Sequence, residues 1–261
     1  MQLPVINAFW IGPRLGPIAI ACLHSFVKAG HRVKLHVYTA PSDAPAGIEL
    51  VDAANLLPPS RVAVHRPSGS YSMTANLFRY EIQAAEQGIY VDCDCYCIRP
   101  IEEAEYIMGF EDQNYICNAV LRLPSDSPLL ADMRKIGAQK AFVPPWLGRR
   151  QRRWYKLRAR LGAAVALADM PWGTSGPLAL THFAQRHGVA DRASAPDIFY
   201  GLPKIYADLL IEPDLTIENF ATPRTRVVHL WNEYSKRLID RAPPGSPIAR
   251  LIQEGRSVPL A

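Results

Sequence analysis

Two aspartates near the middle of the chain, Asp92 and Asp94, have the type and spacing for metal chemistry. They lie in the sequence GIYVDCDCYC, which begins at Gly88. Residues two apart in a β-strand point to the same side, so both carboxylates are predicted to share one face while Cys93 and Cys95 share the other. Mg²⁺ and Mn²⁺ prefer such oxygen ligands. The pair indicates either a divalent metal site or two solvated charges at a strand end.

The beginning of the chain predicts the sheet that would carry this pair. Residues 5–11 and 33–38 are short apolar runs, and residues 17–29 between them have the apolar spacing of a helix. Strands joined through a helix run parallel. A second predicted helix, over 74–87, leads into a strand predicted over 89–95. We therefore expect an α/β fold of Rossmann-like type with a mostly parallel central sheet.

The second half of the chain predicts fewer strands and more loops. Strands are expected at 106–110, 116–123 and 226–231, and helices at 127–138 and 178–187. Residues 47–70 contain several prolines and are expected to be irregular, as is the loop 172–177. The tail after 231 is rich in proline. No repeat or clear linker divides the chain, so a single domain over 1–261 is predicted.

The bulk composition is that of an ordinary globular protein. Hydrophobic residues make up 49% and charged residues 20% of the 261. No apolar run reaches the roughly 18 residues that a membrane span needs. The N-terminus lacks the basic and apolar regions of a secretory signal. Three of the five cysteines alternate along one strand, which favours reduced thiols over disulfides. We therefore expect a cytoplasmic protein.

The net charge of +5 comes from one segment. Arg149–Arg160 holds seven cations in twelve residues, and the rest of the chain has 22 Lys and Arg against 24 Asp and Glu, a balance of −2. Trp154 and Tyr155 lie among the cations. The wider insert 144–162 is predicted to be a helical surface segment that is either solvated or in peripheral contact with the inner membrane face. The nearly neutral remainder argues against nucleic-acid binding.

Four motifs occur in a characteristic order. They are FWIGP from Phe9, LFRY from Leu77, GIYVDCD from Gly88 and VHLWN from Val228. Together they resemble the DXD-containing, sugar-binding glycosyltransferases of family 32 type, which are related to bacterial and fungal galactosyl- and mannosyltransferases. The resemblance implies a GT-A fold, a UDP- or GDP-sugar donor, and Mn²⁺ or Mg²⁺. It also implies transfer of a hexose, with retention, to a saccharide or lipid-linked acceptor in polysaccharide biosynthesis.

The same resemblance implies roles for individual residues. Asp92, Asp94 and His229 would hold the metal, and Arg79 would act beside the two aspartates in catalysis. The residues expected to bind the donor are Trp10, Ile11, Gly12, Asn76, Arg79, Tyr90, Asp92, Thr174, Ser175, Gly176 and Trp231. With no general base evident, front-face attack is expected, in which the leaving phosphate takes the proton of the acceptor.

Each of these residues also has a structural alternative. His229 could be a core histidine, with Asn232 or Glu233 supplying the ligand instead. Trp10 and Trp231 could pack in the core rather than touch a nucleotide, and Arg79 could form an ordinary surface ion pair. A structure can distinguish these alternatives, because each of them places the side chain in a different position.

Two other functions remain open at this stage. Asn76 stands where the family has aspartate, and it can bind a sugar hydroxyl but brings no charge. A degenerate, non-catalytic nucleotide-sugar-binding protein is therefore one alternative. A nucleotidyltransferase acting on sugar phosphates is the other, because it also uses carboxylates, a metal and a nucleotide. A glycosidase fits poorly, because its two carboxyl groups must flank a bond about 5–9 Å apart.

Overall fold

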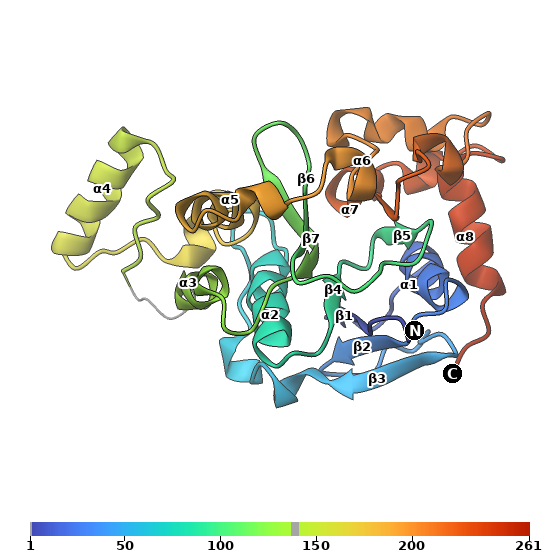
Figure 1. Cartoon of the computed structure of the whole chain (residues 1–261), viewed down its shortest axis with the longest axis horizontal. Helices are drawn as coiled ribbons and strands as arrows, with labels where there is room; N and C mark the ends of the chain where they lie inside the picture. Colours follow the sequence, from blue (N-terminus) through green and yellow to red (C-terminus); the bar gives the residue numbers. More distant parts are fainter. Residues whose placement is uncertain (1, 137–140) are drawn as a thin grey trace.

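The computed structural model describes residues 2–136 and 141–261 and shows an α/β fold. Its central sheet has the strand order β3-β2-β1-β4-β7-β6 (Figure 1). The strands of this sheet are β1 (Ile6–Trp10), β2 (Val33–Val37), β3 (Ile48–Asp52), β4 (Ile89–Val91), β6 (Ile107–Phe110) and β7 (Ile116–Arg122). The pairs among β1, β2, β3 and β4 are parallel, whereas β7 runs antiparallel to both of its neighbours. The prediction of an α/β fold with a mostly parallel central sheet is confirmed.

A second, two-stranded sheet pairs β5 (Cys95–Cys97) with β8 (Val227–His229). The helices are α1 (Pro17–Lys28), α2 (Ser72–Ala84), α3 (Pro128–Ile136), α4 (Arg149–Arg160), α5 (Pro177–Arg186), α6 (Pro196–Phe199), α7 (Asn232–Ser235) and α8 (Pro247–Ser257). The helices predicted over 17–29, 74–87, 127–138 and 178–187 are confirmed with small shifts of their ends. The last two residues of the 127–138 prediction lie outside the described residues.

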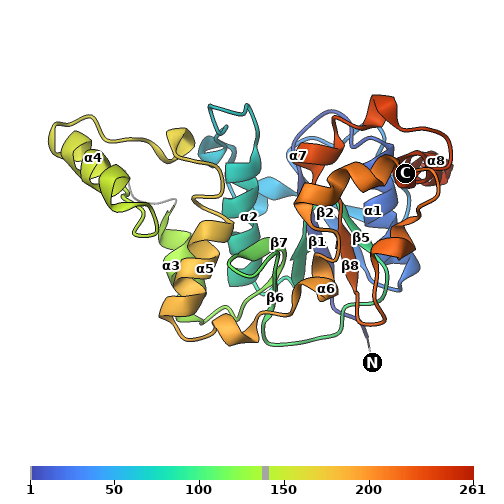
Figure 2. The ribbon, with the colours of Figure 1, turned by 90° about the horizontal axis from the view of Figure 1, so that it is seen from above.

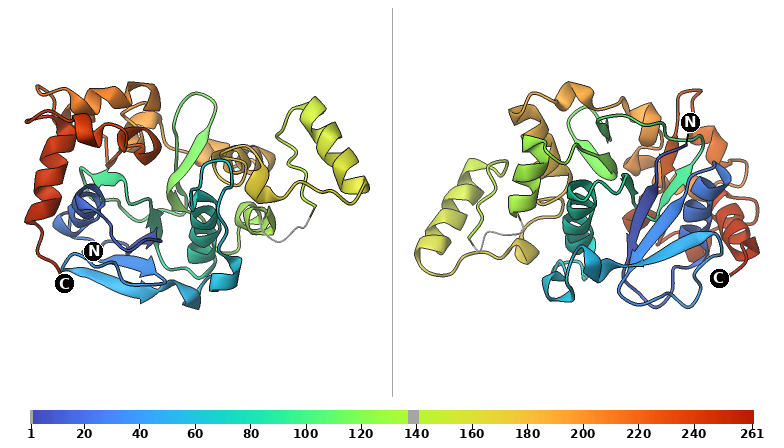
Figure 3. Two further views of the ribbon diagram at one scale, coloured as in Figure 1. Left: turned by 180° about the vertical axis from the view of Figure 1, so that it is seen from behind. Right: turned by 60° about the horizontal axis from the view of Figure 1, so that its bottom comes forward.

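Helices cover both faces of the parallel part of the sheet (Figure 3). Side chains alternate along β1, so Ile6 and Ala8 join the core cluster beneath α1, while Phe9 joins a second cluster with Phe78 of α2. α8 closes the outer side of α1. Their backbones approach so closely that a Cβ built on Gly255 would lie 1.8 Å from the carbonyl oxygen of Pro17. Burial on both faces explains why the central strands are nearly continuous apolar runs.

One predicted strand is wrong in a way that matters for the site. The strand expected over 89–95 ends at Val91, and the chain turns through Asp92, Cys93 and Asp94 before β5 begins. β4 pairs within the central sheet, but β5 pairs with β8 in the second sheet. One continuous strand cannot serve two sheets without a bend. The two carboxylates therefore do not share a strand face; they leave a turn in different directions.

The elements that were not predicted are β3, α8 and the two short helices α6 and α7. Residues 47–70 were expected to be irregular, but β3 lies within them and forms the parallel edge of the sheet. The proline-rich tail contains α8, which starts with a side-chain cap from Ser246 and with Pro247 in its first turn. Proline is favourable at that position, because the amide it lacks has no partner in a first turn.

Helix α4 stands apart from the rest of the molecule. Figure 2 shows it at the end opposite to α1 and α8, joined through the chain on either side of it. The prediction of a helix at the basic segment is confirmed. Among residues 2–136 and 141–261, no helix combines the length and the apolar character needed to cross a membrane.

Candidate functional site

Asp92 follows the carboxyl end of β4 and is held from two sides. Its Oδ1 accepts hydrogen bonds from Nη2 of Arg79 at 2.9 Å and from the Tyr90 hydroxyl at 3.0 Å. Arg79 is almost fully buried and lies over the Tyr90 ring, 4.5 Å from its centroid. A second guanidinium nitrogen donates to the carbonyl of Asn118. Arg79 is thus a buried anchor for Asp92 rather than the surface charge that was the alternative.

Asp94 turns toward the second sheet and meets His229. Nε2 of His229 lies 3.2 Å from Oδ2 of Asp94, and the same oxygen accepts the backbone N–H of Asn232 at 2.6 Å. The two residues meet because Cys95 is paired with His229 in the β5–β8 ladder. Ligand atoms of Asp94, Cys95 and His229 all lie within 4.8 Å of one another. This cluster joins parts of the chain that are far apart in the sequence.

Burial and pairing shift the pKa values of the two carboxyl groups in opposite directions. Burial raises the pKa of Asp92 above its ordinary value, although Arg79 opposes the shift. Burial also acts to raise the pKa of Asp94, but His229 and the Asn232 amide outweigh it and hold that pKa below its ordinary value. Burial acts to lower the pKa of His229, and Asp94 reverses this and raises it. Asp94 is therefore the more firmly anionic carboxylate.

The donor atoms fit a hard divalent cation. The carboxylate of Asp94 and the imidazole of His229 contact each other. Both groups suit Mn²⁺, while carboxylates suit Mg²⁺. Burial raises the pKa of the Cys95 thiol well above its ordinary value. Soft thiolate ligands suit zinc better than Mn²⁺ or Mg²⁺, so Asp94 and His229 are the members of the cluster that favour a hard cation. Nδ1 of His229 is buried without a hydrogen-bond partner among the described residues. This leaves Nε2 as the imidazole atom directed at Asp94.

A buried polar network lies beside Arg79 and includes two residues that sequence reasoning missed. Oδ1 of Asn76 accepts a hydrogen bond from Asn118 at 2.9 Å, and its amide donates to Ser175 at 3.2 Å. The Tyr80 hydroxyl donates to the Ser175 carbonyl at 2.8 Å and accepts from Asn118. Asn118 is a lone polar residue within the apolar run of β7, which is the signal that could have identified it.

The predicted loop 172–177 is thereby brought against α2. Gly176 packs so closely that a Cβ there would lie 3.0 Å from the side-chain amide of Asn76. The hydroxyl of Thr174 donates instead within the loop, to the carbonyl of Pro171 at 2.6 Å. Asn76, Thr174 and Ser175 line a small pocket together with His65 and the half-exposed Trp172. Three of the residues expected to bind the donor, Asn76, Thr174 and Ser175, thus surround one hollow.

The first motif lies next to the Asp92–Asp94 turn. The Cys93 thiol points to the carbonyl of Phe9 at 3.6 Å, which places the end of β1 beside that turn. Trp10 is half-buried, and its indole N–H donates to the carbonyl of Arg14 at 3.0 Å. Gly12 packs closely against this ring, since a Cβ built on it would lie 3.0 Å from the ring nitrogen. Ile11 packs at the margin of the cluster around Phe78.

Trp231 packs rather than presenting its N–H to a ligand. The indole nitrogen donates to the carbonyl of Leu202 at 2.7 Å, and the ring lies 4.2 Å from the ring of His229, centroid to centroid. Its backbone is left-handed, with φ 54° and ψ 63°. That conformation is uncommon for a residue with a large side chain. It turns the chain so that the Asn232 amide reaches Asp94.

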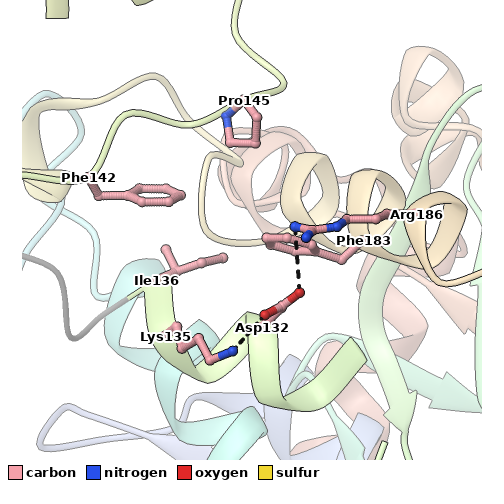
Figure 4. Close-up of a pocket in the computed structure, with 7 residues that line it drawn as sticks. All are labelled: Asp132, Lys135, Ile136, Phe142, Pro145, Phe183 and Arg186. Atoms are coloured by element: carbon pink, nitrogen blue, oxygen red, sulfur yellow. Dashed lines mark hydrogen bonds and ion pairs between the residues drawn. The ribbon is translucent and has the colours of Figure 1, made fainter. Parts of the chain in front are cut away.

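A larger pocket, about 190 Å³, lies elsewhere, between α3 and α5 (Figure 4). Asp132 at its floor is already paired with Lys135 at 2.9 Å and Arg186 at 3.8 Å. Phe142 and Phe183 line the remainder. The charges of this hollow are satisfied internally, and none of the predicted site residues lines it. Its size alone therefore does not make it the functional site.

The chain was also compared with known proteins. No protein-family model matches it, and no curated protein matches it.

Proposed function

We propose that this protein is a metal-dependent, retaining glycosyltransferase of the GT-A type that takes a hexose from a nucleotide diphosphate sugar. The observation that carries the proposal is the meeting of Asp94 and His229 at the end of the Asp-x-Asp turn. An aspartate of such a turn and a late histidine are the metal ligands that the family resemblance implies. The acceptor would be a saccharide or a lipid-linked saccharide.

The position of the turn supports a nucleotide-binding role. Open α/β sheets bind ligands in the crevice beyond the carboxyl ends of their parallel strands. Asp92 follows the end of β4, and Trp10 ends the neighbouring strand β1. The half-buried ring of Trp10 would stack on the base, and Asp94 with His229 would hold Mn²⁺ or Mg²⁺. A bound cation would supply positive charge against the diphosphate as it leaves.

The buried network would orient the sugar. Asn76 and Ser175 line the small pocket, whose volume of about 20 Å³ has room for a single hydroxyl and not for a whole sugar. Because Asn76 already donates to Ser175, the network would hold the loop 172–177 in place at the edge of the sugar site. Arg79 would act as a positioning residue, because its guanidinium already donates hydrogen bonds to Asp92 and to the Asn118 carbonyl. We propose front-face attack: the acceptor oxygen bonds to the anomeric carbon on the side from which the diphosphate departs. The departing phosphate oxygen takes the acceptor's proton.

A ligand screen tests this function. Thermal unfolding is measured with UDP-, GDP- and CDP-sugars, with and without Mn²⁺ or Mg²⁺. We expect one nucleotide to raise the midpoint only when the metal is present, since ligands that bind the folded state stabilise it. Prolonged incubation should release free nucleoside diphosphate. In a parallel incubation with a nucleoside triphosphate and a sugar 1-phosphate, release of pyrophosphate would instead identify a nucleotidyltransferase. Binding without release in either incubation would identify a non-catalytic binding protein.

Asp94→Asn is the matched variant. It removes one charged ligand but little volume, so it should abolish the metal-dependent midpoint rise while the unliganded protein stays folded. Asp208→Asn serves as control, because Asp208 is exposed and forms no ion pair with the described residues. If Asp94→Asn binds metal and nucleotide like the parent protein, the proposed metal site is wrong.

A further inference from the structure

Helix α4 presents an apolar stripe to solvent. Trp154 is 49% exposed, Leu157 is 54% exposed and Leu161, at the end of the helix, is 74% exposed. Their spacing of three and four residues places them within about 60° of one another around the helix axis. Isolated apolar residues on a surface are normal, but an aligned row on a protruding helix marks an interaction face.

The opposite side of α4 attaches it to the protein. Tyr155 is buried in a small cluster with Leu147 and Met170. Gln151 lies one turn before Tyr155 and donates to its hydroxyl at 3.2 Å. This attachment fixes the rotation of the helix, so the row formed by Trp154 and its two leucines points away from the body. The stripe is therefore the free face of the helix and no part of the core.

Cations flank this stripe without internal partners. Arg150, Arg153 and Arg160 are exposed, and no carboxylate among residues 2–136 and 141–261 forms an ion pair with them. Arg158 lies over the Trp154 ring at 5.1 Å. From 133 to 168 the chain contains no acidic residue and ten Lys or Arg. A surface of this kind attracts anions, and its own charges are mutually repulsive until one is bound.

We propose that α4 docks in the plane of an anionic lipid bilayer, with Trp154, Leu157 and Leu161 inserted among the headgroups. A short helix with tryptophan and leucine on one side and arginine at its flanks has the composition of interfacial helices. The apolar row favours a bilayer over a nucleic acid, because a phosphate backbone offers nothing to cover the two leucines. The nearly neutral remainder of the chain adds no second basic surface for a nucleic acid.

Vesicle co-sedimentation tests the proposal with the full-length protein. We expect binding to phosphatidylcholine vesicles that contain one-third phosphatidylglycerol, and little binding to pure phosphatidylcholine. Binding should weaken in 1 M salt, where the Debye length falls to about 3 Å. Replacing Arg150, Arg153 and Arg160 with glutamine should lower the partition coefficient by roughly tenfold or more, because each basic residue near an anionic surface adds attraction.

Two further variants separate the bilayer from other partners. Replacement of Trp154, Leu157 and Leu161 by serine keeps all charge, and it should also lower vesicle binding by roughly tenfold or more, since it removes the inserted apolar surface. Glutamine at the exposed Arg192, Arg241 and Arg256 removes equal charge elsewhere and should change binding far less. Circular dichroism and the thermal midpoint report whether each variant is folded.

Three outcomes would overturn the proposal. Equal sedimentation with neutral and anionic vesicles would show that charge does not direct the binding. Undiminished binding by the folded serine variant would show that the stripe is not inserted. Tight binding of single-stranded RNA, together with weak vesicle binding, would assign α4 to a nucleic acid instead. None of these measurements requires donor, metal or activity, so they stand apart from the test of the proposed function.

Discussion

Arg79 and Asp92 form a unit in which the arginine is the buried partner and the aspartate is the one that reaches the surface. The side chain of Arg79 is 4% exposed and that of Asp92 is 28% exposed. A buried ion pair adds little net stability, but removal of one partner leaves the other charge without compensation. The pair is therefore best explained as a device that fixes the direction of Asp92 at the turn.

This arrangement predicts an unusually large stability effect at one residue. Arg79→Met should lower the free energy of unfolding by about 3–5 kcal/mol, since it leaves Asp92 beside an apolar side chain and the Asn118 carbonyl without its donor. Arg61→Met is the control, because Arg61 pairs with Glu81 at 3.4 Å but is 38% exposed, and such pairs contribute less than about 1 kcal/mol. Urea unfolding measures both, and equal losses would contradict the anchoring role.

The residues of the site differ in how far the sequence could identify them. Asp92 and Asp94 stood out by type and spacing, but nothing in the spacing pointed to His229; the family resemblance did. Their direction could not be predicted, because it depends on a turn between two sheets. Asn118 was missed, since a single asparagine in an apolar strand is a weak signal until Asn76 and Tyr80 are placed beside it.

Strands β1 and β2 are joined by a buried polar contact as well as by their ladder. Nε2 of His36 lies 2.9 Å from Oδ1 of Asn7, whose amide donates to the Gln87 carbonyl at 2.7 Å. Because Oδ1 of Asn7 can only accept a hydrogen bond, Nε2 of His36 carries the proton of the ring. Nδ1 of His36 is buried without a partner among the described residues. A second proton would therefore have to enter the core at an atom with no acceptor.

This contact predicts an acid-sensitive stability. Burial, with help from Lys34, lowers the pKa of His36 from 6.5 to about 4. Between these values the unfolded chain binds a proton that the folded protein does not. Stability should therefore fall as the pH drops from 6.5 toward 4, by about 3 kcal/mol from this residue. Urea unfolding of His36→Gln across this range should show a flatter pH dependence than the parent; identical slopes would contradict it.

The elements show why a local pattern predicts some structures and not others. α1, α2 and the strands at both ends of the β-α-β opening follow from apolar periodicity, since each buries one face or both. β3 was not predicted, because its three middle residues are exposed or half-exposed and give no apolar run. The prolines that follow it also favoured an irregular segment. α8 was hidden in the same way, because a proline at the first turn was taken as a sign of a loop rather than of a helix start.

The whole molecule has its candidate site and its basic helix in different regions. The Asp92–Asp94 turn lies at the carboxyl end of the central parallel strands, and α4 stands beyond α3 and α5 at one end (Figure 1). α4 is attached chiefly through the cluster around Tyr155, Leu147 and Met170. This cluster meets the core between α3 and α5 through the half-buried Trp146 and Leu167. Such a segment can open locally while the sheet stays folded.

This separation predicts that α4 unfolds on its own. Trypsin should first cleave native protein within Arg149–Arg160 while the sheet keeps its thermal transition. Tyr155→Ser removes a buried aromatic side chain and should lower the free energy of opening α4 by about 2 kcal/mol. Cleavage within α4 should then be roughly 30-fold faster, because the rate of proteolysis follows the population of the open form. The thermal midpoint should stay near that of the parent. Tyr206→Ser, at an exposed tyrosine, is the control. If the midpoint instead falls together with the protease resistance, α4 and the sheet unfold as one unit.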